Sequence, residues 1–342
     1  MEPHVTPEHV MQIGMGFMAS KTLLSAIEMD LFTLLAAGPK TAAQVGDRLG
    51  LHPRSLHDFL DALVSLKLLD RDGDGPASSY RNTSETGIFL DKNSQAYLGG
   101  ILEMANARLY PFWGGLTEAL RTGEPQNELK QGKGSPFEVI YADEARLEQF
   151  LRAMQGIQMG NMMALAEKVD FGKYGTLCDV GGANGSLASI VSKRHPKLAC
   201  TSFDLAPVEA VARRHVEAMG AAARVKVVSG DFFKDPLPKA DVITMGNILH
   251  DWDEAQKKAL MRKAYEAVNP GGMFIAIEAI IDDARRTNTF GLLMSLNMLI
   301  ELPGGFDYTG AQFDGWAREA GFTRTEIVPL TGPSSAAIAY KA

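Results

Sequence analysis

The chain has 342 residues, of which 46% are hydrophobic and 22% charged, so it is long enough for two packed units with buried cores. Its net charge of −7 at pH 7 disfavours nucleic-acid binding through many phosphate contacts, and its two cysteines are too few for a disulfide scaffold. Because it lacks a signal-peptide pattern and any uninterrupted apolar run of about eighteen residues, we expect a soluble, cytoplasmic protein that binds no membrane.

The amino-terminal half is predicted to be mainly helical. Residues 10–37 repeat apolar side chains at three- and four-residue spacing, and a glycine–proline pair ends this pattern. Two more helices are expected over 41–69, and the stretch 70–90, rich in Gly, Asp and Ser, is expected to form a β-hairpin. This order is typical of a winged helix. More helix is expected over 94–170, with a pause at 122–136.

From residue 171 the pattern changes to short apolar runs separated by helical stretches. The predicted strands are TLCDV, ACTSFD, RVKVVSG, ADVITMG, MFIAIEAI, TEIVPL and SAAIAYK. Five of them alternate with helices and the last two are close in sequence, which predicts a doubly wound, Rossmann-like α/β sheet of seven strands ending in an antiparallel hairpin. We therefore expect a winged-helix-like domain at 1–95, a helical linker at 96–170 and an α/β domain at 171–342.

A glycine-rich loop, CDVGGANGS, follows the first predicted strand. Gly181, Gly182 and Gly185 would let the backbone turn sharply and approach a ligand, although their spacing differs from the G-x-G-x-x-G of dinucleotide sites. Asp179, just before them, would repel a pyrophosphate but attract an ammonium group. S-adenosylmethionine carries an ammonium and a sulfonium and no phosphate, so the charge favours this methyl donor over NAD.

Two further acids stand at the ends of predicted strands. Asp204 ends the second strand, where a carboxylate can accept both hydroxyls of a ribose. Asp231 ends the third strand, where it can bind the adenine amino group while Phe232 packs on the ring. Each acid, taken alone, could instead cap a helix or a turn. Acids at three consecutive strand ends, on the edge where such sheets bind ligands, favour donor binding.

His250 lies in GNILHDWDE, after the fourth predicted strand and at the same edge of the sheet. A lone histidine there could be structural, but Glu278 in FIAIEAIID and Asp307 after LPGGF could both reach its ring. Such acids would fix the tautomer and stabilise the imidazolium. Since a phenol has a pKa near 10 and a histidine about 6.5, proton transfer between them is uphill by about 5 kcal/mol unless the acids raise the base strength.

These motifs together resemble the class I O-methyltransferase family that includes plant caffeate and animal hydroxyindole O-methyltransferases and bacterial tailoring enzymes of aromatic polyketides. The resemblance covers nearly the whole chain: DVGGANG resembles the donor loop, FDLAPV the ribose-binding strand end, GDFF the adenine contact and HDW the segment of the catalytic histidine. It implies S-adenosylmethionine-dependent methyl transfer to a hydroxyl, most simply a phenol, of a small aromatic or polyketide-like metabolite. His250 is then the base, with Glu278 and Asp307 as its partners.

The resemblance also implies binding residues. Those expected at the donor are Asp179, Gly181, Gly182, Gly185, Asp204, Leu205, Asp231, Phe232, Gly246 and Trp252. Those expected at the acceptor are Phe150, Met154, Met294, Met298, Asn106 and Trp113, although methionine and aromatic residues at helical spacing are also typical of a core. Two positions depart from the plant members: Gly246 replaces a lysine, and Asp307 is one methylene shorter than their glutamate.

In this family the winged-helix unit serves for homodimerisation and closes over the partner's pocket. Its candidate recognition helix, HPRSLHDFLDAL, has one arginine and two aspartates, which suits DNA poorly. No histidine and acid spacing indicates a metal, and a histidine base needs none. Two alternatives stay open: carbon methylation or a non-methylating reaction with the donor still bound, and a winged-helix regulator that senses a small molecule.

Overall fold

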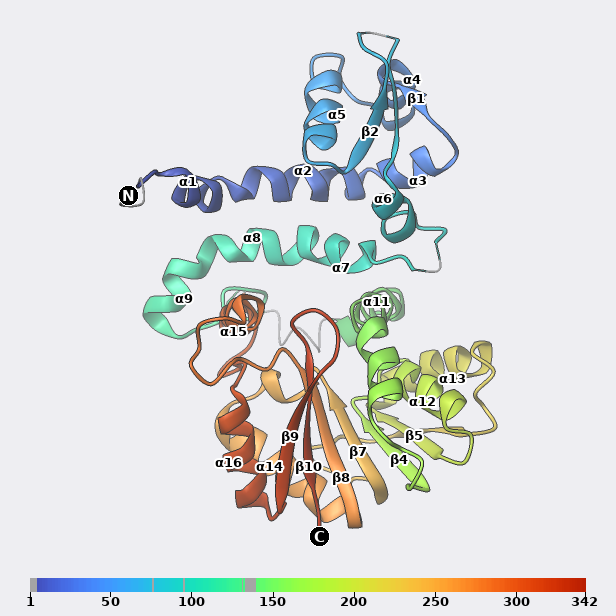
Figure 1. Cartoon of the computed structure of the whole chain (residues 1–342), viewed down its shortest axis with the longest axis vertical. Coiled ribbons are helices and arrows are strands. Elements are labelled where there is room, and N and C mark those ends of the chain that lie inside the picture. Colours follow the sequence, from blue (N-terminus) through green and yellow to red (C-terminus); the bar gives the residue numbers. More distant parts are fainter. Residues whose placement is uncertain (1–4, 76, 95, 131, 133–139) are drawn as a thin grey trace. The chain divides into compact units, whose positions relative to one another are not determined.

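The computed structural model describes residues 5–75, 77–94, 96–130, 132 and 140–342. It divides into two compact units, Met1–Pro111 and Phe112–Ala342 (Figure 1). The predicted helical linker, 96–170, is thus divided between the units. Helix α9 ends at Thr122, where the predicted pause begins, and residues 131 and 133–136 of that pause lie outside the described residues.

The first unit is mainly helical. Its helices are α1 (Glu8–Gly14), α2 (Gly16–Glu28), α3 (Leu31–Ala36), α4 (Ala42–Leu49), α5 (Leu56–Ser65), α6 (Ser84–Phe89) and α7 (Gly99–Met104), then the π-helical turn η1 (Ala105–Leu109) and α8 (Tyr110–Phe112), which reaches the second unit. Strands β1 (Lys40–Thr41), β3 (Ser79–Asn82) and β2 (Leu69–Asp72) form an antiparallel sheet in that order. Helices α4 and α5 followed by the β2–β3 hairpin give the predicted winged-helix arrangement.

Local sequence explains the ends of helix α4. The Thr41 side chain accepts a hydrogen bond from the backbone N–H of Gln44, whose own side chain bonds back to Thr41, a capping box. Gly50 ends the helix at a φ of 67°, in the left-handed region that favours glycine. Helix α5 begins at Leu56, six residues after Gly50.

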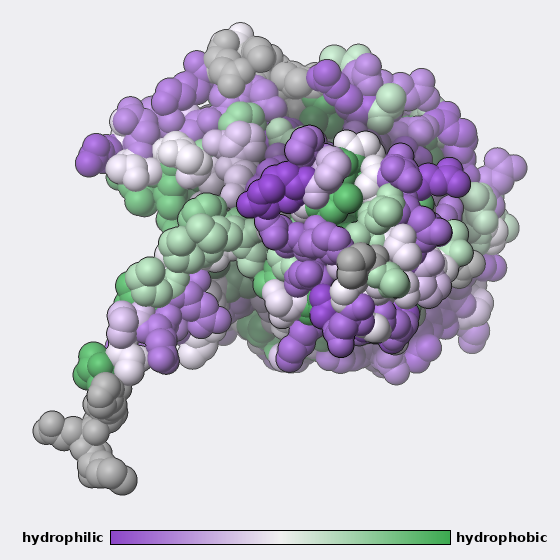
Figure 2. Space-filling model, turned by 90° about the horizontal axis from the view of Figure 1, so that it is seen from above, coloured by the Kyte–Doolittle hydropathy of each residue, from purple (hydrophilic) through white to green (hydrophobic). Residues whose placement is uncertain are grey.

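The amino-terminal helices leave apolar side chains uncovered. Val10, Ile13 and Phe17 of α1 and α2 are 71%, 70% and 54% exposed. Apolar surface, green in Figure 2, accordingly lies along the projecting α1. By length and composition alone residues Glu8–Glu28 could cross a membrane, although the sequence pattern had predicted no such span. This stretch needs a partner surface of some kind to cover it.

The second unit is built on a seven-stranded sheet. Its strands are β4 (Thr176–Val180), β5 (Ala199–Asp204), β6 (Val225–Ser229), β7 (Ala240–Gly246), β8 (Val268–Glu278), β9 (Arg324–Pro329) and β10 (Ser335–Tyr340). They lie in the order β6-β5-β4-β7-β8-β10-β9, and neighbours from β4 to β8 are parallel, whereas β10 pairs antiparallel with β8 and β9 (Figure 1). The predicted Rossmann-like α/β fold is confirmed.

Helices cover both faces of this sheet. Those that pack on it are α11 (Glu144–Lys168), α12 (Ser186–Arg194), α13 (Glu209–Ala218), α14 (Glu254–Ala267) and α16 (Gly310–Ala320). The unit also contains α9 (Leu116–Thr122) and α15 (Thr289–Glu301), which pack on each other, and the 3-10 turns η2 (Trp113–Gly115), η3 (Ala206–Val208) and η4 (Leu249–Asp251). Successive strand residues belong to opposite cores: Val242 packs with α11, α12 and α13, and Ile243 with α14 and α16. Because β4 to β8 are parallel, their carboxyl ends meet at one edge.

Candidate active site

The glycine loop between β4 and α12 depends on its glycines. Gly181 and Gly185 have φ angles of 69° and 77°, in the left-handed region. An added Cβ would lie 3.0 Å from the carbonyl oxygen of Asp179 at Gly182, and 2.6 Å from Cγ2 of Val216 at Gly185. The loop therefore packs so closely against β4 and α13 that these positions admit no side chain.

Asp204, at the end of β5, ties this loop to the next strand. One carboxylate oxygen accepts a hydrogen bond from the backbone N–H of Ala183 (2.8 Å), and the other from the N–H of Leu205 (2.7 Å). Burial nevertheless raises the pKa of Asp204 to about 6, against these two bonds. Each oxygen keeps a lone pair, so the carboxylate can still accept hydroxyl groups from a ligand.

Asp179 lies behind the glycine loop and is 4% exposed. Its Oδ1 accepts a hydrogen bond from the Thr244 hydroxyl at 2.7 Å. Burial raises the pKa of Asp179 to about 7, although the Thr244 bond opposes this change and the charge of Asp204 adds to it. A cation placed beside this carboxylate would be stabilised by it and would lower its pKa.

Asp231 and Phe232, the adenine contacts predicted at the end of β6, differ in how far other residues of the chain already contact them. Asp231 bonds the Lys234 side chain (2.8 Å) and the N–H of Phe233 (2.9 Å), and chiefly the Lys234 bond lowers the pKa of Asp231. The Phe232 ring lies 6.0 Å from the Trp252 ring, whereas Phe233, which we had not predicted, lies at 4.6 Å. Within the described part of the chain, the buried Nε1 of Trp252 has no hydrogen-bond partner. It could donate to a ligand beside these rings.

Gly246, at the end of β7, leaves space where plant relatives carry a lysine. An added Cβ would meet nothing nearer than Ile277, at 3.9 Å. The glycine is thus not required by packing at this position, and the site has room there for part of a ligand.

His250 lies in turn η4 between two acids, the buried Asp307 and the partly exposed Asp251. Its Nδ1 is 3.3 Å from Oδ1 of Asp307, and its Nε2 is 3.4 Å from Oδ1 of Asp251. The hydrogen bond of Glu278, expected at the ring, goes instead to the backbone N–H of His250 (3.2 Å). Asp307 therefore reaches the ring despite its shorter side chain, and Asp251 occupies the second ring nitrogen.

These acids make the imidazole a strong base. Burial disfavours the charged ring, but the charge of Asp251, the hydrogen bond and charge of Asp307 and the charge of Glu278 outweigh it and raise the pKa of His250 to about 10. Burial also raises the pKa of Asp251 to about 7, against the pull of His250. Because a phenol has a pKa of about 10, proton transfer to His250 becomes nearly isoenergetic.

A tight turn brings Asp307 to the histidine. Gly304 has a φ of 78°, and a Cβ at Gly305 would lie 3.1 Å from the carbonyl oxygen of His250. The N–H of Phe306 donates to that same carbonyl at 2.8 Å, and the N–H of Asp307 donates to the Ser295 hydroxyl at 3.2 Å. The GG pair thus allows the close backbone approach that places the acid.

Two more buried residues belong to this cluster and were not predicted. Lys257 of α14 is 0% exposed, and Tyr308, next to Asp307, is 1% exposed. Lys257 shares a helix face with Leu260, Met261 and Ala264, all buried, at spacings of three, four and seven residues. That periodicity was the available signal for Lys257. Nothing in the sequence around Tyr308 distinguished it from an ordinary core residue.

The predicted acceptor residues are spread over three places. Phe150 and Met154 lie on α11, and Met294 and Met298 on α15, where Met298 is 7% exposed and so packs as a core residue. In the same unit, Nε1 of Trp113 donates to Oδ1 of Asn297 at 2.9 Å. Asn106 belongs to the first unit, where it bonds Lys21 (2.6 Å) and Glu28 (2.7 Å).

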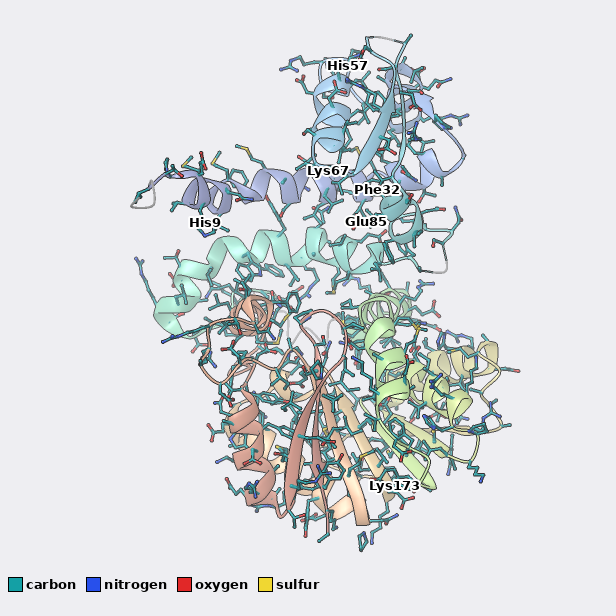
Figure 3. All side chains as sticks on the ribbon, in the orientation of Figure 1. His9, Phe32, His57, Lys67, Glu85 and Lys173 are labelled. Atoms are coloured by element: carbon teal, nitrogen blue, oxygen red, sulfur yellow. The ribbon has the colours of Figure 1, made fainter. Side chains whose placement is uncertain are left out.

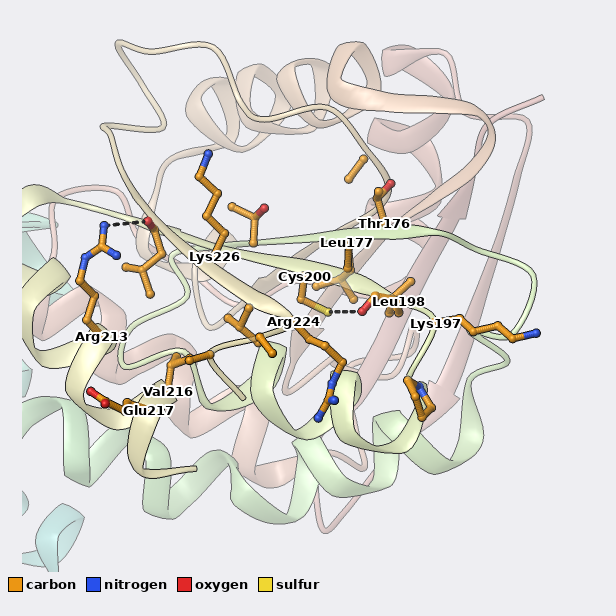
Figure 4. A pocket seen from close by; sticks show the side chains of 18 of the residues that line it. Thr176, Leu177, Lys197, Leu198, Cys200, Arg213, Val216, Glu217, Arg224 and Lys226 are labelled. Carbon is orange, nitrogen blue, oxygen red and sulfur yellow. Dashed lines mark hydrogen bonds between the residues drawn. The ribbon is translucent and has the colours of Figure 1, made fainter. Parts of the chain in front are cut away.

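Another pocket lies away from these residues. It has a volume of about 770 Å³ and is lined at the amino ends of β4, β5 and β6, with Arg213 and Glu217 of α13 beside it (Figure 4). None of the predicted site residues lines it, and parallel sheets bind their ligands at the opposite edge. Within the described ranges, no group of three His, Cys, Asp or Glu residues is arranged to hold a metal ion.

Known proteins resemble the chain over its whole length. The O-methyltransferase domain matches residues 113–323, and the O-methyltransferase dimerisation domain matches residues 11–92. The tetracenomycin polyketide synthesis 8-O-methyl transferase TcmO of Streptomyces glaucescens is 40% identical over 100% of this chain and 99% of its own. The N,N-dimethyltransferase OxyT of Streptomyces rimosus is 35% identical over 87% of this chain and 85% of its own. The crystal structure of human N-acetylserotonin methyltransferase with SAM has a TM-score of 0.90 and 30% sequence identity, and the match covers 100% of this chain and 99% of that one.

Asp307→Asn should lower the pKa of His250 by about one unit or more, because the ring loses a hydrogen-bonded negative charge. The titration of ¹³C-labelled histidine side chains by NMR measures this, with His250→Gln identifying the resonance. Asp314→Asn, which removes an acid paired with Arg318 on α16, is the control. An unchanged His250 titration in Asp307→Asn would show that Asp307 does not set the base strength.

Proposed function

The chain belongs to the O-methyltransferases that carry an amino-terminal dimerisation domain, and on that basis we propose that His250 is the general base of S-adenosylmethionine-dependent O-methylation. The acceptor we propose is a phenolic hydroxyl of a small aromatic, polyketide-like metabolite. The observation that carries this proposal is the buried ring held at Nδ1 by Asp307 at the carboxyl edge of the sheet. Asp251 lies 3.4 Å from Nε2, and we propose that this nitrogen takes the proton once the acceptor displaces or shares the Asp251 contact.

The carboxyl edge fits the donor. The glycine loop presents bare backbone to the methionine portion, with Asp179 to meet the ammonium and the free lone pairs of Asp204 to accept the ribose hydroxyls. The rings of Phe232 and Trp252 offer an apolar wall for adenine. We assign Leu205 and Gly246 to the same site by their strand-end positions. When bound, S-adenosylmethionine supplies an electrophilic methyl group on a sulfonium, so the chain has to position the acceptor and take its proton.

The proton transfer follows from the ring contacts. If Nδ1–H donates to Asp307, the tautomer leaves the Nε2 lone pair free to accept the phenolic proton. Asp251 at Nε2 and Asp307 at Nδ1 then both stabilise the imidazolium that forms. Glu278 holds the backbone of His250 and contributes its charge. We thus assign Glu278 a positioning role and Asp307 the role of orienting the ring.

Two segments are proposed to face the acceptor. Phe150 and Met154 on α11, with Met294 on α15, would form an apolar, deformable slot for a flat ring. Trp113 and Met298 support it from the core side. The similarity to TcmO, a polyketide 8-O-methyl transferase by name, favours a polycyclic phenol. The similarity to OxyT, an N,N-dimethyltransferase by name, makes an amine the second candidate acceptor.

The match to a dimerisation domain supports homodimer formation. We propose that a second copy of the chain covers the apolar side chains of α1 and α2, including Val10, Ile13 and Phe17. A dimer interface would explain why the helical stretch Glu8–Glu28 is apolar enough to cross a membrane, although most of it belongs to the dimerisation domain matched over residues 11–92. Asn106, which bonds Lys21 and Glu28 in the first unit, stays a predicted acceptor residue. We propose that the enzyme works as a soluble cytoplasmic protein without nucleic acid.

His250→Gln should lower kcat for a phenolic acceptor by about 10²- to 10⁴-fold, because the acceptor proton loses its base. The affinity for S-adenosylhomocysteine, measured by calorimetry, should stay near that of the wild type. His57→Gln, at an exposed position of α5 in the first unit, is the matched control (Figure 3). Unchanged turnover in His250→Gln would remove the histidine from the chemistry, and an N-methylated product in mass spectrometry would favour the amine candidate.

Asp204→Asn should weaken S-adenosylhomocysteine binding by about tenfold or more, because a neutral amide accepts ribose hydroxyl bonds less strongly than a carboxylate. Isothermal titration calorimetry measures the loss. Glu217→Gln, in the pocket at the opposite edge, should bind as the wild type does. Equal affinities for the wild type and Asp204→Asn would reject the ribose assignment.

Phe17→Asp should shift the protein from dimer to monomer, because a charge cannot be buried in an apolar interface without compensation. Light scattering after size-exclusion chromatography measures the molar mass. Ile327→Asp, an exposed apolar position (40%) on the edge strand β9 of the second unit, should leave the dimer intact. A dimeric Phe17→Asp protein would place the interface elsewhere.

A further inference from the structure

The buried lysine of α14 has no role in the scheme above. Resting on the proposed function of His250, we propose that Lys257 is a positioning residue that joins the histidine segment to the Asp307 turn and supplies the positive charge that limits proton uptake by the buried acids. It acts through these residues and does not touch the acceptor.

The contacts of Lys257 are unusual for a lysine. Its side chain is 0% exposed, and its Nζ donates a hydrogen bond to the carbonyl oxygen of Trp252. The same Nζ lies 3.5 Å from the centroid of the Phe306 ring, a cation–π contact. A lysine that only filled space would be replaced at lower cost by an apolar residue, since burying an ammonium requires compensation.

These two contacts lie on the two segments whose junction places Asp307 at His250. Trp252 ends the segment that carries His250, and Phe306 belongs to the turn that carries Asp307. The two sides already meet through the hydrogen bond from the Phe306 N–H to the His250 carbonyl at 2.8 Å. Lys257 therefore adds a second link across the same junction, one that is fixed to helix α14.

The charge of Lys257 acts on the buried acids from a distance. The titratable groups that face it are Asp251 of η4, Asp253 at the start of α14, Glu278 of β8 and Asp307 of the turn, with His250 and Tyr308 in the same cluster. Among described residues, none of these carboxylates forms an ion pair with its Nζ within 4 Å. In a water-poor interior a charge still has a strong effect at longer range.

The sign of this effect follows from the charge balance. The buried carboxylates of Glu278 and Asp307 and the partly exposed one of Asp251 face one imidazole, and the cation of Lys257 reduces their combined pull on a proton. Without it the cluster would bind its proton more tightly, and less of His250 would be free to act as a base at neutral pH. Burial lowers the pKa of Lys257 itself to about 8, although the four acids oppose this.

Lys257→Met is the direct test, because methionine fills the space of the side chain without its charge. Because Lys257 carries its charge only below about pH 8, kcat in Lys257→Met should fall by up to about tenfold at neutral pH and return to the wild-type value as the pH rises above 8. Lys257→Arg, which keeps the charge, should restore the wild-type kcat at neutral pH. Lys258→Met is the matched control, because this neighbouring lysine bonds Glu254 and Glu319 on the surface.

A readout that needs no turnover separates this proposal from the proposed function. The NMR titration of ¹³C-labelled His250 should begin at higher pH in Lys257→Met, because the wild-type lysine is charged only in the lower part of this titration, and should stay in place in Lys258→Met, while the affinity for S-adenosylhomocysteine is unchanged. An equal loss of activity at every pH, or an unmoved His250 titration, would overturn the proposal. If Lys257→Met does not fold, Lys257→Gln carries the same expectations. A wild type that methylates no phenol would contradict the proposed function alone, since the titration still tests Lys257.

Discussion

The gathering of three carboxylates around one buried imidazole, with Glu278 and Asp307 buried and Asp251 only 12% exposed at its side chain, is the constraint on which the rest of the site depends. A carboxylate removed from water needs a bond or a charge to compensate it, and Asp307 finds this at the ring, Glu278 at the backbone N–H of His250 and Asp251 at the second ring nitrogen. The Asp307 contact forms only where two backbone segments approach closely, which Gly305 permits. The base strength of His250 is thus a consequence of how the turn packs.

The parallel sheet brings this cluster to the donor. The ends of β4 and β5 carry the glycine loop and Asp204, and the ends of β7 and β8 lead to His250 and Glu278. Because all four strands are parallel, the two sets of groups meet at one edge although they lie up to about a hundred residues apart in sequence. An acid-rich edge suits a cationic methyl donor, and that same cation would ease deprotonation of an acceptor beside it.

Much of this arrangement could be predicted from the sequence, because it depends on local pattern. The strand boundaries at Thr176–Val180 and Ala240–Gly246 match the apolar runs, and Asp307 was predicted at the ring from its turn. That Glu278 accepts from the backbone N–H of His250 and not from its ring could not be predicted, because this depends on the direction of the side chain at the end of β8. Lys257 was missed for a different reason: among the charged residues of α14 only its helix face marks it as buried.

The central claim is that His250 takes the proton from the acceptor. A crystal structure with S-adenosylhomocysteine and a phenolic acceptor bound tests it most directly, through the distance between the acceptor oxygen and Nε2 of His250. We predict a hydrogen bond of about 2.6–3.2 Å, with Asp251 displaced or shared and Nδ1 still on Asp307. A hydroxyl held by another side chain, with Nε2 still closed by Asp251, would contradict the account.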